Sequence, residues 1–136
     1  MKSHLVLPIA VAVTALSMNH IQAQQSEIHC VVPFAFHVAE KTLPAGDYLT
    51  VQHNGYKTVQ NRVTGQTEIA SIGNPNVSGA PGARMVFNKY GNTYFLEEIW
   101  TDQQTGSRVP VSKEEQNLRR EAEVLAQNTV TIIAQR

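Results

Sequence analysis

The chain has 136 residues, and its 11 Lys and Arg balance its 11 Asp and Glu, so its formal net charge is +0 at pH 7. A neutral chain lacks the basic patch with which proteins bind nucleic acid, which excludes this class of partner. The chain has 1 cysteine and therefore no internal disulfide. In an oxidising compartment Cys30 is either buried as a small hydrophobic residue or links two copies into a covalent homodimer.

The N-terminal segment up to Ala23 has the three-part layout of a secretory signal peptide. A short positive start leads into residues 5–18, which are almost wholly apolar, and the segment turns polar before Ala23. The apolar run is shorter than the roughly 20 residues that a spanning helix needs, which argues against a retained membrane anchor. We therefore predict cleavage between Ala23 and Gln24. Residues 24–136 would form one exported domain, in the periplasm or outside the cell.

The stretch from Cys30 to Val51 organises the rest of the chain. Apolar residues recur there at every second position, which places them on one face of a strand and favours burial of the cysteine: Cys30, Val32, Phe34, Phe36 and Val38. Pro33 donates no ladder hydrogen bond, so this strand should lie at a sheet edge or carry a bulge. The sequence Leu-Pro-Ala-Gly at 43–46 predicts a tight turn into a second strand at 47–51.

Six later segments also have the composition of strands and are separated by turn residues. They are 56–63, 67–72, 83–89, 93–101, 108–111 and 129–134. Residues 73–82, dense in Gly, Pro, Asn and Ser, predict a surface loop. The pattern predicts a mainly β fold, namely an antiparallel β-barrel or sandwich of seven or eight strands with one C-terminal helix packed on it.

One helix is predicted from Lys113 to Ala126. Ser112 and Glu115 match a capping box, and Glu115 with Arg119 forms an i,i+4 pair on the exposed side. The helix should face the sheet with a narrow apolar stripe. The stripe consists of Leu118, Ala122 and Leu125.

The segment 93–101 carries large apolar side chains on both faces, as expected for a central or covered strand. Strict alternation gives one face with Tyr94, Leu96, Glu98 and Trp100 and another with Phe95 and Ile99. An unpaired carboxylate among aromatic residues is costly, so we expect Glu98 to pair with Arg84 or Arg108. A structural ion pair is one interpretation. The other is a ligand-binding site formed by Glu98, Tyr94 and Trp100.

No catalytic, cofactor-binding or metal-binding constellation is recognisable, so we predict a protein without enzymatic activity, cofactor or metal. Glu97 and Glu98 are neighbours on a strand and point to opposite faces, so they cannot act together as acid and base. His29 and His37 are separated by about 26 Å along a strand, too far to share a metal ion. His53 lies beside a hairpin turn, and we expect all three histidines to be solvated.

Two runs of the sequence resemble a family of small exported bacterial proteins of acidobacterial type. They are PFAFHVAEKTLPAGDYLTV at residues 33–51 and FNKYGNTYFLEEIW at residues 87–100. The matched motifs are VPFxF, LPAGxY and a YGxxYFLxEIW-like strand, and members of the family also carry a charged helix near the end. The resemblance implies a secreted β-rich fold across most of the mature chain and brings no catalytic residues with it.

These observations favour an exported, non-catalytic binding or structural protein. One alternative is a small apolar-ligand carrier, which requires a barrel that encloses an apolar cavity. The other is a small secreted hydrolase, which requires a cleft that brings His37 or His53 together with Glu97 or Glu98.

Overall fold

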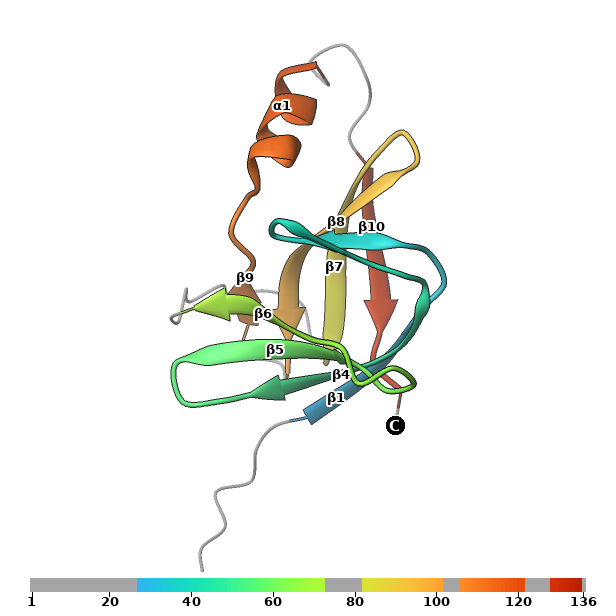
Figure 1. The fold of residues 1–136 in the computed structure, drawn as a ribbon, viewed down its shortest axis with the longest axis vertical. Helices are drawn as coiled ribbons and strands as arrows, with labels where there is room; N and C mark the ends of the chain where they lie inside the picture. Colours follow the sequence, from blue (N-terminus) through green and yellow to red (C-terminus); the bar gives the residue numbers. More distant parts are fainter. Residues whose placement is uncertain (1–26, 73–81, 102–105, 122–127, 136) are drawn as a thin grey trace, which may run out of the picture.

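The computed structural model describes residues 27–72, 82–101, 106–121 and 128–135 (Figure 1). The predicted cleavage between Ala23 and Gln24 and nearly all of the predicted loop at 73–82 therefore lie outside the described residues. Within the described ranges, no helix is long and apolar enough to cross a membrane.

The described part of the chain is mainly β, as predicted, and contains one helix. Its elements are β1 (Glu27–Val32), β2 (Phe36–Val38), β3 (Lys41–Leu43), β4 (Gly46–Gln52), β5 (Tyr56–Asn61), β6 (Thr67–Ile72), β7 (Arg84–Tyr90), β8 (Thr93–Trp100), β9 (Gly106–Arg108), α1 (Lys113–Glu121) and β10 (Asn128–Ile133). The described strands outnumber the predicted seven or eight for two reasons. The first predicted strand divides into β1 and β2, and β3 forms just before the predicted turn.

The strands form two sheets in a sandwich-like arrangement (Figure 1). The first sheet has the order β1-β4-β5-β6, and the second has the order β10-β7-β8-β2-β3, with β9 also paired to β8. β2 pairs with β8 in parallel through His37 and Phe95. The expectation of an antiparallel fold is wrong at this pair, because the chain enters the second sheet directly from β1 rather than through a hairpin with β8.

The strand predicted around Pro33 is interrupted there. β1 ends at Val32 and β2 begins at Phe36, and the two strands belong to different sheets. Proline has no N–H group with which to continue a ladder, so the chain leaves the first sheet at this point and crosses to the second. β1 lies at the sheet edge, as predicted. The alternation survives the crossing, because Val32 and Phe36 are buried and Phe34 is half-buried.

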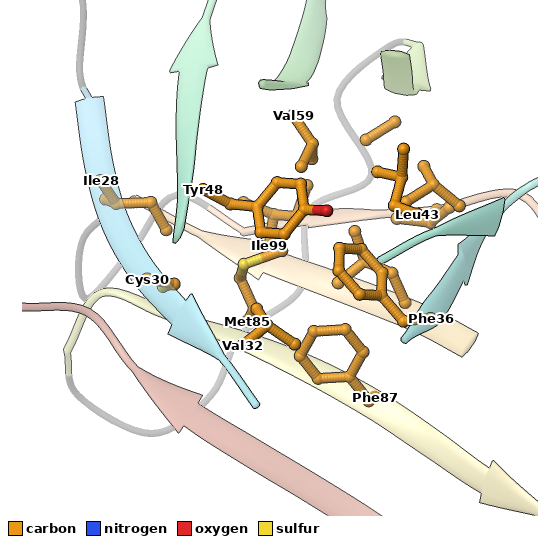
Figure 2. Packing of buried hydrophobic residues seen from close by; sticks show 14 residues of the cluster. Ile28, Cys30, Val32, Phe36, Leu43, Tyr48, Val59, Met85, Phe87 and Ile99 are labelled. Atoms are coloured by element: carbon orange, nitrogen blue, oxygen red, sulfur yellow. The ribbon is translucent and has the colours of Figure 1, made fainter. Parts of the chain in front are cut away.

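The hydrophobic core lies between the two sheets. The Phe36 ring meets Tyr48 of the first sheet and Phe87 of the second edge to face, at centroid distances of 5.0 and 5.3 Å (Figure 2). Burial of an aliphatic or aromatic side chain contributes roughly 1.5–3 kcal/mol, so this cluster holds the sheets together. Its buried members are Ile28, Cys30, Val32, Phe36, Val38, Leu43, Tyr48, Val59, Ala70, Met85, Phe87, Leu96, Ile99 and Val109.

Helix α1 begins where the sequence predicts, and the Ser112 hydroxyl accepts a hydrogen bond from the Glu115 N–H at 3.1 Å. Its docking differs from the prediction. Glu115 is the buried residue of the helix and Leu118 is only half-buried, while the rest of the predicted stripe lies outside the described residues. The pair of Glu115 with Arg119 therefore lies on the docked side, because the carboxylate finds hydrogen-bond donors on the sheet.

Cys30 is buried in the core with 1% of its surface exposed. This placement agrees with the first alternative for this residue, burial as a small hydrophobic side chain, and not with a covalent link between two copies. Burial raises the pKa of its thiol from 9.0 to about 11, and a backbone hydrogen bond with Met85 partly opposes this shift. The reactive thiolate is therefore scarce at neutral pH.

We expect Ellman's reagent to modify Cys30 in denaturant and to leave it unmodified in the native protein over the same time. The reason is that native Cys30 is both inaccessible and protonated. The measurement is the absorbance of the released thiolate with and without denaturant. Equal rates under both conditions, or a disulfide-linked dimer on a non-reducing gel, would contradict this placement of the residue.

Candidate functional site

The outer face of the second sheet carries several of the polar and aromatic side chains that are candidates for function, among them Glu98 and Trp100. β7 is buried on both of its faces. Met85 and Phe87 belong to the core, whereas Asn88 and Tyr90 point the other way and contact Glu115 of α1. Since Asn88 is 1% and Tyr90 7% exposed, this outer face is a second buried layer rather than an open surface.

A β-bulge at Glu97 changes the direction in which the side chains of β8 point. Val86 of β7 pairs with Glu98, but the next residue, Phe87, pairs with Leu96. Glu97 is therefore the extra residue of the strand, and its carbonyl accepts a hydrogen bond at 2.8 Å from the N–H that follows β9. A bulge of this kind shifts the alternation of side chains by one position.

The bulge divides the predicted ligand-binding site. Tyr94 packs against the core and stacks on Phe34 at a centroid distance of 3.8 Å. Glu98 and Trp100 lie beyond the bulge and face outward, so the structure keeps these two together and places Tyr94 and Leu96 on the opposite face. The prediction of one shared face is wrong because it assumed uninterrupted alternation.

Trp100 and Glu98 form the first of two polar clusters on the outer face. The indole Nε1 donates to Glu98 Oε2 at 2.9 Å, and Arg108 Nε lies 3.7 Å from Glu98 Oε1. The predicted pairing of Glu98 with Arg108 is thus confirmed. Arg84 instead places its guanidinium over the Trp100 ring, 4.5 Å from the ring centre, in a cation–π contact. With 1% of its surface exposed, Trp100 is a packed residue.

Glu115 is the centre of the second cluster. Its Oε1 atom accepts hydrogen bonds from Asn88 Nδ2 at 3.1 Å, from the Tyr90 hydroxyl at 3.2 Å and from Arg119 Nη2 at 3.3 Å. Arg119 Nε also donates to the Tyr90 hydroxyl at 2.9 Å. Burial raises the pKa of Tyr90 above 10.0, although the hydrogen bond from Arg119 opposes it. The phenol therefore remains a neutral donor, and the cluster is suited to hold the helix in place.

His37 lies on the same face, close to the start of the helix. Its ring stacks on Phe95 with a centroid distance of 4.6 Å and an interplanar angle of 19°. Its Nδ1 atom lies 3.1 Å from the Thr42 hydroxyl and 3.8 Å from a carboxylate oxygen of Glu114. The nearest carboxylate to His37 thus comes from the helix and not from Glu97 or Glu98.

The other two histidines of the described residues belong to the first sheet and its β4–β5 turn. His29 is hydrogen-bonded to Asp47, and Arg62 Nη1 lies 3.2 Å from the same ring nitrogen. His53 stacks on Tyr56 at a centroid distance of 4.5 Å. Like His37, both are half-buried against neighbouring side chains rather than freely solvated. Over the ranges that the structure describes, no three His, Cys, Asp or Glu side chains are placed to share a metal ion.

The motifs of the sequence do not predict the residues that join α1 to the second sheet. These residues are Asn88, Tyr90 and Glu115. One signal was available, because Asn88 and Tyr90 lie two positions apart on β7, a strand in the middle of its sheet. A polar residue on a central strand needs a partner above the sheet. Comparison with family models, with curated proteins and with solved structures gave no match to this chain.

We expect Gly106→Ala to destabilise the protein by about 1–3 kcal/mol, the usual cost of overpacking. An added Cβ at Gly106 would lie 2.7 Å from the Trp100 ring, which Arg84 confines from another side. The measurement is urea-induced unfolding followed by tryptophan fluorescence. Gly46→Ala is the matched control, because its Cβ would make an ordinary contact at 3.4 Å. An equal loss in both variants would contradict the packing of Trp100 on Gly106.

We expect Glu115→Ala to lower the free energy of unfolding by about 1–3 kcal/mol, because it leaves the buried donors of Asn88 and Tyr90 without their acceptor. Its neighbour Glu114→Ala serves as the control. The Glu114 side chain is 60% exposed, so its loss should change stability by no more than about 0.5 kcal/mol. Denaturant unfolding of both variants, monitored by circular dichroism, measures the difference. Similar effects would mean that Glu115 does not dock the helix.

Proposed function

We propose that this chain is an exported, non-catalytic binding or structural protein. The observation that carries the proposal is the filled space between the sheets. Phe36, Tyr48 and Phe87 each have 0% of their surface exposed, and the Phe36 ring packs edge to face against the other two rings (Figure 2). A protein whose interior is occupied by its own side chains recognises other molecules through its surface.

Two features of the sequence support the location. The layout up to Ala23 is that of a signal peptide, and the motifs at 33–51 and 87–100 resemble a family of exported proteins.

For the architecture, we infer a sandwich rather than a barrel. β6 is the last strand of the first sheet in the described ranges, so the order β1-β4-β5-β6 supports an open edge there.

A small apolar-ligand carrier is the second candidate, and one observation favours it. A hollow of about 220 Å³ lies along the β6 edge and has mainly apolar walls. Its lining residues are Ala39, Ile69, Ala70, Ser71 and Pro110. This volume is below the roughly 300–1,000 Å³ of typical ligand pockets, so surface recognition of a macromolecular partner remains the preferred proposal.

The hydrolase alternative receives less support. It needs His37 or His53 beside Glu97 or Glu98, but Glu98 is occupied by Trp100 and Arg108. His37 stacks on Phe95 and His53 on Tyr56. The Glu98 carboxylate and the two imidazole rings are thus engaged in separate packing contacts.

Native mass spectrometry of the full chain, expressed with export and purified without detergent, tests the proposal. We expect a mature mass that begins near Gln24 and carries no small molecule. A mass that retains Met1 to Ala23 would contradict export. A bound small molecule would favour the carrier, provided that Ile69→Asp abolishes it and Val63→Asp does not. Ile69 lines the hollow and is 57% exposed, and Val63 is an 86% exposed control in the turn between β5 and β6.

A further inference from the structure

The turn between β4 and β5 carries the only Asn-Gly pair of the chain, at Asn54 and Gly55. β4 ends at Gln52 and β5 begins at Tyr56, so the pair lies at the tip of a hairpin. Both residues of the pair are exposed. An exposed loop tip of small and polar residues moves more readily than the strands that it connects, so this tip can change conformation without disturbing the core.

Gly55 leaves its own backbone nitrogen open to attack. Its φ is 88°, in the left-handed region that residues with a side chain rarely adopt. A Cβ built on Gly55 would meet no atom within 4 Å, so the space beside this residue is empty. Because glycine carries no side chain, neither crowding nor a restricted φ hinders the approach of a neighbouring group to its N–H.

The ends of the turn are held in place, whereas the amide at its tip is not. The His53 N–H donates to the Tyr56 carbonyl at 2.8 Å, and the two side-chain rings stack at a centroid distance of 4.5 Å. The Gln52 side chain donates to both backbone carbonyls, at 2.5 and 3.3 Å. Among the described residues, none forms a hydrogen bond with the Asn54 side chain. The Asn54 amide is therefore free to turn toward the Gly55 nitrogen.

We propose that Asn54 is a site of spontaneous deamidation in the folded protein. The Gly55 nitrogen attacks Cγ of Asn54 and gives up its proton, the bond from Cγ to Nδ2 breaks, and ammonia leaves with that proton. The product is a cyclic succinimide. Because the two reacting groups belong to adjacent residues, the step is intramolecular and has the large entropic advantage of such reactions.

Water then opens the succinimide ring at one of its two carbonyl carbons. Addition at the side-chain carbon restores the original backbone and leaves an aspartate. Addition at the main-chain carbon leaves an isoaspartate, whose backbone runs through the former side chain. Over both steps one water is consumed, one ammonia is released and no electron is transferred. Either product adds a negative charge to a chain whose formal net charge is +0.

The isoaspartate product also changes the geometry of the hairpin. It lengthens the backbone by one carbon between His53 and Tyr56, and loop length determines how the two strands of a hairpin meet. We expect the stack of these two rings and the 2.8 Å hydrogen bond between their backbones to be lost. Strand pairs farther from the tip, such as Thr50 with Val59, should keep their contacts, because both residues are buried.

Asn92 supplies a matched control within the same molecule. It is exposed and also lies in a tight turn, between β7 and β8. Its successor is Thr93, whose branched side chain crowds the backbone nitrogen that would have to attack. Trypsin separates the two asparagines into the peptides 42–57 and 90–108, so mass spectrometry follows each one independently.

The experiment ages the full chain in warm, mildly alkaline buffer, with a parallel sample in denaturant, and digests both with trypsin. We expect the peptide with Asn54 to gain the mass difference between an amide and an acid and to separate into aspartate and isoaspartate forms. The native rate should lie within about tenfold of the rate in denaturant, because the fold opposes the reaction with little more than one turn hydrogen bond. A slower native rate, or equal conversion of Asn54 and Asn92 in the native chain, would overturn the proposal.

Two variants assign the new charge to its source. Asn54→Gln replaces the reacting group in an exposed position, and we expect it to abolish the acidic species that accumulates on ion-exchange chromatography of the aged protein. Asn92→Gln is the matched control, and it should accumulate this species as the wild type does. If Asn54→Gln still produces the acidic species at the wild-type rate, another residue is the source and the assignment to Asn54 is wrong.

Discussion

The central constraint on this fold is that β7 is buried on both faces and that β8 buries large side chains on both. One face of the pair belongs to the core, and the other carries Asn88, Tyr90, Glu98 and Trp100. A buried polar group without a partner costs about 1–3 kcal/mol, so the outer face must be closed by groups that satisfy these side chains. Two carboxylates meet this requirement. Glu98 accepts from the Trp100 indole, and Glu115 reaches in from α1 to Asn88 and Tyr90.

Docking a helix through a carboxylate differs physically from docking it through an apolar stripe. A buried ion adds little net stability, because its desolvation offsets most of its attraction, but it tolerates only positions in which its donors are aligned. Glu115 accepts from three side chains at 3.1 to 3.3 Å. The same contacts that fix the position of α1 therefore make this face a support for the fold.

Much of the fold follows from local rules. Alternation identified the buried face of the first strand, including Cys30, and Pro33 marked the point at which that strand leaves its sheet. The helix start followed from Ser112. The candidate site could not be predicted in the same way, because one extra residue at Glu97 separates Tyr94 from Trp100. A bulge depends on the pairing of two strands and leaves no mark in either strand alone. The role of Glu115 likewise depends on donors 25 and 27 residues away in the sequence.

The outer face of the second sheet carries buried side chains such as Asn88 and Trp100, whereas Ile69 of the first sheet is exposed. Ile28 and Cys30 of β1 point into the core, whereas Val31 is 42% exposed and His29 lies beside Asp47 and Arg62 on the other face. An apolar residue next to a mixed-charge group is typical of surfaces that bind proteins, in which an apolar centre is bordered by polar side chains. The surface recognition that we propose would find on this face an apolar centre and a polar border.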